Sequence, residues 1–293
     1  MIMLIFIDCQ NAEFCCSKTI HMKTILFATD FSRAANKAIH IATQIAIKQE
    51  ARLVLYHSYR FMNTYDDNYG YPIDVVKRIT DRKLNDLKKR ILAKAEKPAE
   101  IILCNKHGFV MDTIKEPIDE FGVDLIVISS VGDTPLEAGY FGSIATEMLD
   151  KLNVPMLLLP PKYRRTTIEN AVMAVDLKKP IDARALDKAV YFLRDLDTIV
   201  DVVYVAKTDE ELKSEEVKEA GLKLRELLKN VPHTFQTIVG NKQVNEINGF
   251  VKKRKAQLLI TFPKLHTFFE KFFLQGNTRR LVFEIDVPLL AIK

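Results

Sequence analysis

The sequence contains no tryptophan and only four cysteines in 293 residues. Three of these, Cys9, Cys15 and Cys16, lie within the first 21 residues, so the body of the chain contains Cys104 alone. This is too few for a disulfide framework, and no Cys-x-x-Cys pair indicates a zinc or redox site. A reducing compartment, the cytoplasm, is therefore the expected location.

Long hydrophobic runs are also missing, since no apolar segment approaches the roughly 20 residues that span a bilayer. The net charge is only +5, which is too small to indicate a nucleic-acid or membrane-surface partner. The basic runs at residues 88–90 and 252–255 fall at the ends of predicted helices and are interpreted as solvated faces. The chain has the composition of a soluble globular protein, and its length allows two domains of about 140 residues.

The first 21 residues do not share the pattern of the rest of the chain. The apolar opening at residues 1–7 carries no basic residue and is followed by Asp8, which matches a signal peptide poorly. The stretch Met22-Lys23-Thr24-Ile25-Leu26 has the character of a protein start that leads into a strand. We therefore expect residues 1–21 to lie outside the fold, either as a disordered leader or as an extension that the native protein lacks.

Residues 22–160 predict a first domain in which strands and helices alternate. Compact apolar runs predict strands at 24–29, 52–57, 99–104, 125–128 and 154–159. Apolar positions at helical spacing predict helices from the capping residue Ser32 to about 48, and over 75–94, 110–121 and 144–152. Pro117 is expected either to kink the third helix or to break it in two. This alternation predicts a doubly wound parallel sheet with helices on both faces.

A polar linker at residues 161–167 is followed by the same pattern, which predicts a second domain over 168–293. Its strands are expected at 170–175, 198–205, 233–239, 256–261 and 287–292, and its helices over 181–193, 209–228 and 244–253. The two halves end with related sequences, Val-Pro-Met-Leu-Leu-Leu at 154–159 and Val-Pro-Leu-Leu-Ala-Ile at 287–292. These similarities indicate an internal duplication of about 130 residues. The predicted fold class is α/β, with two tandem five-stranded parallel sheets.

Residues 123–143 combine a strand, a glycine-bearing loop and a helix start. The buried strand is followed by Gly132 and Gly139, and Gly142-Ser143 opens the next helix. Glycine lets a backbone approach a ligand closely, and the free N–H groups of a first helical turn favour an anion. The pattern predicts a phosphate-binding turn. A plain surface loop, in which the glycines serve only the turns, is the alternative.

Several motifs occur in the order and spacing of a known family. They are Ile-Leu-Phe-Ala-Thr-Asp-Phe-Ser at 25–32, Asp-Leu-Ile-Val-Ile at 124–128, Gly142-Ser143 and the closing Val-Pro strand. Over residues 22–160 the chain resembles a universal stress protein domain, and residues 168–293 are similar to a weaker copy. The resemblance implies a tandem stress-response or signalling protein with a Rossmann-like fold of the adenine nucleotide alpha hydrolase type.

The resemblance also implies a nucleotide site in the first domain. Nucleotide-binding members carry Gly-x2-Gly-x9-Gly-[Ser/Thr] after the fourth strand. Here nine residues separate Gly132 from Gly142-Ser143, and Ser129 stands at the position of the first glycine. The phosphates of ATP or ADP would be held by Gly132, Gly142, Ser143 and Ile144, and the adenosine would lie near Ala28, Thr29 and Asp30.

The expected topology places this site at the switch point, where ligands of doubly wound sheets bind beyond the carboxyl ends of the strands. The strands that end at Thr29 and Ser129 would flank it. Two interpretations of Asp30 stay open. Its carboxylate could bond the ribose or adenine, or it could simply end the strand and begin the Asp-Phe-Ser turn.

The second half departs from the family pattern. Thr261-Phe262-Pro263-Lys264 replaces the small and glycine positions, eleven residues separate Lys264 from Gly276, and Asn277 takes the place of the family's Ser or Thr. Between them, Phe268, Phe269, Phe272 and Phe273 recur at helical spacing, which indicates packing. We expect no nucleotide there, and interpret this half as a structural or partner-docking copy.

The sequence carries no set of catalytic residues that can be recognised. There is no Gly-x-x-x-x-Gly-Lys-[Ser/Thr] motif, and His57 and His107 have no partner at ligand spacing. Asp133 and Glu137 could supply oxygen ligands to Mg²⁺ beside phosphates, or could be solvated loop acids. No enzyme activity beyond slow ATP hydrolysis is expected.

Two hypotheses on function follow. In the first, a nucleotide-binding stress or signalling protein forms an intramolecular pseudo-dimer with one working site, joined through the last strands of its halves, as dimers of this family often are. Such pairing would remove two exposed sheet edges. In the second, the chain is a structural or interaction member that binds no nucleotide and acts through a protein partner that the sequence does not identify. Whether the chain also forms a homodimer is left open.

Overall fold

The computed structural model describes residues 22–60, 72–94, 100–130, 143–163, 165, 167–178, 182–194, 198–263 and 287–293. The expected leader at residues 1–21 and the phenylalanine-rich segment of the second half lie outside these ranges. Within them, no helix is long and apolar enough to cross a bilayer.

The first unit alternates strands and helices in the predicted order. Its elements are β1 (Thr24–Ala28), α1 (Arg33–Lys48), β2 (Arg52–Tyr59), α2 (Ile73–Leu92), β3 (Ile101–His107), α3 (Val110–Thr113), α4 (Lys115–Phe121), β4 (Leu125–Ser129), α5 (Ser143–Lys151) and β5 (Met156–Leu159). The predicted third helix is broken in two at Ile114, as one of the two expectations for Pro117 allowed. Pro117 itself lies in the first turn of α4, where a backbone N–H has no partner within the helix and its loss costs little.

The second unit repeats this order. Its elements are β6 (Asn170–Val175), α6 (Ala183–Arg194), β7 (Ile199–Ala206), α7 (Asp209–Lys213), α8 (Glu215–Leu227), β8 (His233–Val239), α9 (Gln243–Arg254), β9 (Leu258–Thr261) and β10 (Leu289–Ala291). The charged helix predicted over 209–228 is interrupted at Ser214, which the sequence pattern did not indicate. Ser214 has an extended backbone, and its hydroxyl accepts a hydrogen bond from the Val217 N–H, so α8 starts anew with its own cap.

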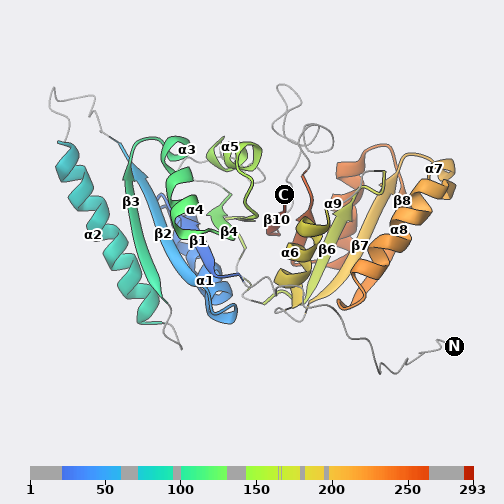
Figure 1. Cartoon of the computed structure of the whole chain (residues 1–293), viewed down its shortest axis with the longest axis horizontal. Helices are drawn as coiled ribbons and strands as arrows, with labels where there is room; N and C mark the ends of the chain where they lie inside the picture. The colour runs from blue at the N-terminus through green and yellow to red at the C-terminus, as the bar shows by residue number, and fades with distance from the viewer. Residues whose placement is uncertain are drawn as a thin grey trace.

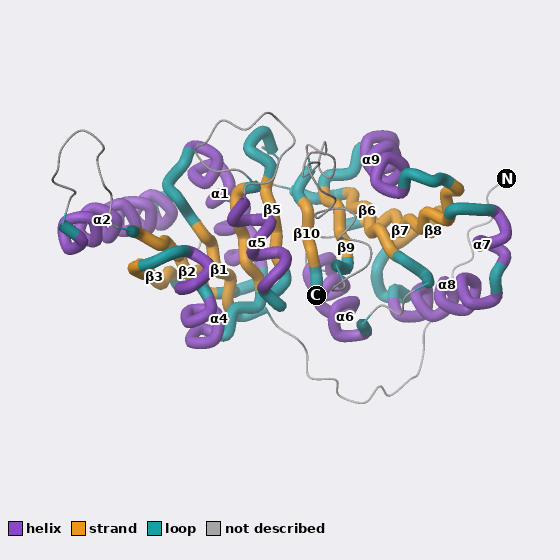
Figure 2. Tube along the Cα trace, turned by 90° about the horizontal axis from the view of Figure 1, so that it is seen from above, coloured by secondary structure: helices purple, strands orange, loops and turns teal. Residues whose placement is uncertain are grey.

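The ten strands of the described residues form a single sheet in the order β3-β2-β1-β4-β5-β10-β9-β6-β7-β8. Every neighbouring pair is parallel except β5 and β10, which run antiparallel with Leu157 opposite Leu290. Figure 2 shows these two strands side by side in the middle of the molecule. The predicted pairing of the last strands is thus confirmed, and it joins the two expected sheets into one.

The helices cover both faces of the sheet, as a parallel sheet requires. Core residues of α1, α2, α6 and α8 pack together on one face, and those of α4, α5 and α9 pack on the other. Both clusters contain residues from the two units, so the core continues across the β5–β10 junction. Figure 1 shows the two halves side by side, with α2 at one end of the molecule and α8 at the other.

A hydrogen-bonded clip before the fourth strand of each unit supports the duplication. In the first unit, Asp124 Oδ2 accepts from the Lys23 N–H at 2.7 Å and the Thr24 N–H at 3.1 Å. In the second unit, Gln257 Oε1 accepts from the N–H groups of Glu169 and Asn170 at 2.5 and 3.4 Å. Each clip ties the start of the first strand of its unit to the start of the fourth. The architecture is therefore repeated down to individual hydrogen bonds, although the residues have changed.

Candidate functional site

The candidate site lies at the carboxyl edge of the first unit, between β1 and β4. These strands are neighbours, with Ala28 opposite Ile128, while β1 pairs with β2 on its other side. The chain therefore changes direction across the sheet at this point, as the topology of a doubly wound sheet requires. Thr29 and Ser129 are both buried at the ends of these adjacent strands. Three predicted residues, Ala28, Thr29 and Ser129, are thus brought together.

The turn after β1 is held by its own side chains. Thr29 Oγ1 accepts from the Phe31 N–H at 3.0 Å, and Asp30 Oδ1 accepts from the Ser32 N–H at 2.9 Å. Ser32 then caps α1, because its hydroxyl accepts from the Ala35 N–H. Phe31 has a φ of +63°, a conformation that a bulky residue rarely adopts. The bond to the Ser32 N–H gives Asp30 a role in the turn, as one of its two interpretations expects, and its exposed carboxylate leaves the ligand role a prediction.

His57 on β2 fixes this turn from the side. Its Nδ1 lies 2.7 Å from the Thr29 carbonyl oxygen. Because a carbonyl can only accept, Nδ1 carries the proton in this contact. The His57 ring also packs against Phe31 at 4.4 Å between centroids, and the Lys83 ammonium lies 5.4 Å from the Phe31 ring centre. Burial lowers the pKa of His57, although the bond to Thr29 opposes this shift.

Helix α5 begins with Ser143, which is exposed, and Ile144, whose relative exposure is 38%. Because α5 follows β4, its N-terminus lies at the carboxyl edge of the sheet, beside α3 at the upper edge of the first half in Figure 1. Its first turn contains no acidic residue, so the positive end of the helix dipole is not neutralised by its own side chains. Of the predicted phosphate contacts, Ser143 and Ile144 are therefore placed at this edge.

Gly132 and Gly142, together with the magnesium candidates Asp133 and Glu137, lie outside the described residues. Within the described ranges, no cluster of three or more His, Cys, Asp or Glu side chains could hold a metal ion.

The corresponding edge of the second unit carries an internal charge network. Glu211, in α7, accepts a hydrogen bond from the Tyr204 hydroxyl at 2.5 Å and forms an ion pair with Lys178 at 2.7 Å. Burial and the neighbouring carboxylate raise the pKa of Tyr204. Asp176, the counterpart of Asp30, accepts from the Lys178 N–H, as in a simple turn. At the end of β9, the strand registers place Phe262 at the position of Ser129, and Pro263, which follows it, is buried.

Sequence patterns did not reveal the role of His57 or the network around Glu211. Both depend on side-chain contacts between segments whose approach is set only by the folded sheet. The position of His57 at the end of a predicted strand was the one available signal. Nothing in the pattern of residues 209–213 distinguished Glu211 from its acidic neighbours.

Residues 21–160 match the family model described as the Universal stress protein family. A sequence search finds no curated protein that matches the chain.

Solved structures resemble the chain over nearly its full length. A universal stress protein from Archaeoglobus fulgidus DSM 4304 superimposes with a TM-score of 0.71 at 15% identity, covering 94% of this chain and 99% of that chain. A putative universal stress protein from Pseudomonas aeruginosa UCBPP-PA14 gives 0.63 at 15% identity, with 94% of each chain covered. A functionally unknown protein, PA1789, from Pseudomonas aeruginosa PAO1 gives 0.62 at 16% identity, covering 93% and 92%. At these identities the likeness concerns the fold alone, and it extends over both units. Residues 21–160 therefore belong to the universal stress protein family, and the second unit repeats the fold of the first.

Proposed function

We propose that the first unit binds ATP or ADP at its carboxyl edge and that the chain acts as a nucleotide-responsive stress or signalling protein of the cytoplasm. Ala28, Thr29 and Asp30 would contact the adenosine. Ser143 and Ile144, with Ser129 and the glycines at 132 and 142, would contact the phosphates, and Mg²⁺ could accompany them. No catalytic role is assigned to any of these residues.

The observation that carries this proposal is that β1 and β4 end side by side at the switch point, at the edge of the sheet where α5 begins. Ala28, Thr29 and Ser129 are small residues, so their side chains add little bulk over the ends of the two strands. The open first turn of α5 favours an anion. His57 and the hydrogen-bonded turn hold Thr29 and Asp30 in place without a ligand. Less conformational entropy is therefore lost when a ligand binds.

We propose that the second unit does not bind nucleotide. Helix α7, which follows β7 at the carboxyl edge of this unit, begins with three acidic residues, which disfavour a phosphate. One of them, Glu211, already forms an ion pair with Lys178 and accepts a hydrogen bond from the Tyr204 hydroxyl. The second unit therefore supplies structure and surface, and a protein partner would be recognised there or across both units.

Calorimetric titration of the purified chain with ATP and ADP, with and without Mg²⁺, tests the proposal. The informative variant is Ser143→Asp, which adds one negative charge at an exposed first helical residue. We expect it to weaken nucleotide binding at least about tenfold, because a carboxylate at this helix end repels phosphate. The matched control is Asn241→Asp, which makes the same charge change at an exposed position just before α9 in the second unit.

Three outcomes would contradict the proposal. Nucleotide binding could be absent at millimolar concentration, it could be equally weakened by both variants, or it could be unaffected by either. The first outcome would favour the alternative function, an interaction module without nucleotide. Ser129, where nucleotide-binding relatives have glycine, is the observation that favours that alternative.

A further inference from the structure

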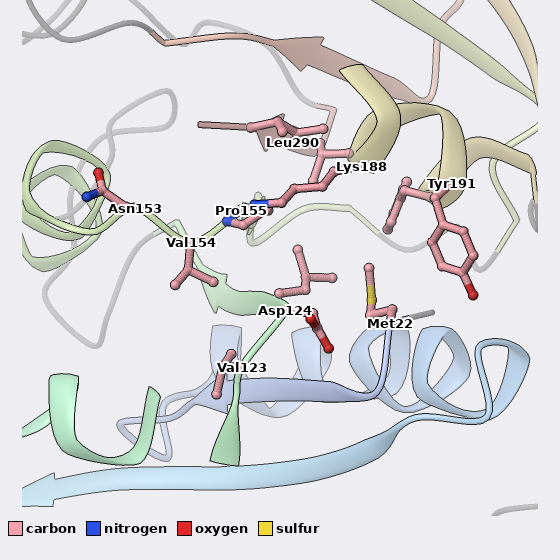
Figure 3. Close-up of a pocket in the computed structure, with 12 residues that line it drawn as sticks. Met22, Val123, Asp124, Asn153, Val154, Pro155, Lys188, Tyr191 and Leu290 are labelled. Carbon is pink, nitrogen blue, oxygen red and sulfur yellow. The ribbon is translucent and has the colours of Figure 1, made fainter. Parts of the chain in front are cut away.

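A partly enclosed cavity of about 140 Å³ lies where the two units meet. The first unit contributes residues that precede β1, β4 and β5, and the second contributes α6 and β10 (Figure 3). The cavity is therefore at the amino edge of the first unit, opposite the candidate nucleotide site. It does not depend on the function proposed above.

Most of the cavity wall is apolar. Val154 and Pro155 from the first unit line it together with Phe192, Leu290 and Ile292 from the second. A dry cavity of about 150 Å³ with such a lining can hold a benzene-sized group. The space therefore suits an isobutyl or benzyl group rather than a nucleotide or a sugar.

Two unlike charges interrupt this apolar wall. Lys188 on α6 is half-buried, and among the described residues its ammonium makes no ion pair. The Asp124 carboxylate is held in place by the Lys23 and Thr24 N–H groups, which both donate to Oδ2, and no described residue donates to Oδ1. These two groups do not pair with each other within the described structure. Each charge in the wall is therefore able to bind a ligand group of opposite sign.

We propose that this cavity binds a free α-amino acid with an apolar side chain. The ligand carboxylate pairs with Lys188, its ammonium pairs with Asp124, and its side chain fills the apolar space. A hydrocarbon would leave both protein charges unpaired, and a simple carboxylate would place a second anion near Asp124. A zwitterion satisfies both charges at once, and it bridges the two units.

Calorimetry and thermal unfolding of the full chain with L-leucine and L-phenylalanine test this assignment. Isocaproate, which lacks the ammonium, and isoamylamine, which lacks the carboxylate, are the matched ligands. We expect each to bind at least about tenfold more weakly than leucine, because one charge-assisted pair is lost. Bound leucine should also raise the unfolding temperature, since only the folded chain brings both units to the site.

The variants are Lys188→Met and Asp124→Asn. Methionine keeps an unbranched apolar side chain at 188, and asparagine keeps an oxygen that can accept from the Lys23 and Thr24 N–H groups. Each should weaken leucine binding at least about tenfold, while Lys252→Met, at an exposed position on α9, should leave it unchanged. The assignment is overturned if leucine and phenylalanine fail to bind at millimolar concentration, if isocaproate binds as tightly as leucine, or if Lys188→Met has no effect in a variant that unfolds like the parent chain.

Discussion

At the scale of single residues, Asp30 has one role that is visible in the structure and one that is proposed. Its Oδ1 accepts the Ser32 N–H within the turn, and its exposed carboxylate lies beside the candidate nucleotide site. Asp30→Asn keeps an oxygen for the turn but removes the charge, whereas Asp30→Ala removes both. We expect Asp30→Ala to lower the free energy of unfolding by about 1 kcal/mol, as is typical for loss of one such hydrogen bond. Asp30→Asn should unfold like the parent chain, and denaturant titration would measure the difference.

Nucleotide affinity separates the two interpretations of Asp30. If its carboxylate bonds the ribose or adenine, both variants should bind ATP or ADP more weakly than the parent chain in calorimetry. Equal affinity of Asp30→Asn and the parent would leave Asp30 a turn residue only. Loss of stability in Asp30→Asn would contradict the assignment of the Ser32 bond.

At the scale of elements, sequence periodicity predicted most strands and helices because their apolar faces are determined by local spacing. The exceptions have local causes that hydrophobic spacing does not report. Ser214 caps a second helix inside a continuous charged pattern. The break between α3 and α4 is at Ile114, three residues before Pro117, from which the sequence predicted it.

The candidate site could be predicted in part. The adjacency of Thr29 and Ser129 follows from the order of strands in a doubly wound sheet, so it could be expected from the sequence. The bond between His57 and the Thr29 carbonyl could not, because it depends on a side-chain rotamer and on the register of β1 with β2. The ligand roles of all predicted residues remain predictions.

Strand β7 buries a charged side chain at a position where its counterpart in the first unit, β2, has an apolar one. Asp201 is 5% exposed, and it accepts hydrogen bonds from Arg254 Nε at 2.6 Å and from the Thr234 hydroxyl at 2.5 Å. Strand registers place Val54 at the equivalent position of β2. The pair therefore ties α9 to the sheet at a site where a simple apolar residue also fits the fold.

Arg254→Met should lower the free energy of unfolding by about 3 kcal/mol, because it leaves a buried carboxylate without its partner. Asp201→Val should cost less, since the Arg254 side chain is 41% exposed and can turn to water. The free energy of unfolding of the double variant should be within about 1 kcal/mol of that of the parent chain, because replacing both members of a buried pair by apolar residues is often nearly neutral. Urea denaturation of the four proteins measures this, and a double variant no more stable than Arg254→Met would contradict it.

Lowering the pH should also weaken the pair between Asp201 and Arg254 and so lower the free energy of unfolding. Burial acts to raise the pKa of the Asp201 carboxyl, but the bonds from Arg254 and Thr234 outweigh it and hold that pKa below its ordinary value. A lowered pKa in the folded state gives stability that is present at neutral pH and is lost as the pH falls through that pKa, below about 4. The parent chain should therefore lose more stability than the double variant between pH 5 and the acid limit of folding.

At the scale of the whole molecule, the β5–β10 junction turns two units into one sheet. Met156 and Leu158 belong to the core on one face, and Leu157 and Leu159 belong to the core on the other. All four are almost completely buried, so β5 is an interior strand only because β10 lies beside it. The outer edges of the ten-stranded sheet are instead β3 and β8.

A chain that ends after Tyr163 keeps β1 to β5 but leaves the β5 edge open, with its backbone groups and apolar side chains unpaired. An open edge of this kind is a template for pairing with another strand. We expect two copies of this fragment to pair antiparallel through β5, as β10 pairs with it in the full chain, and light scattering after size-exclusion chromatography should give twice the fragment mass. Leu158→Pro in the same fragment should keep it monomeric, because proline lacks the backbone N–H that pairing at the open edge requires, while circular dichroism checks that it remains folded. A folded fragment that stays monomeric without this substitution would mean that β5 does not need a partner strand, and the junction would then be a consequence of the duplication rather than a requirement of the fold.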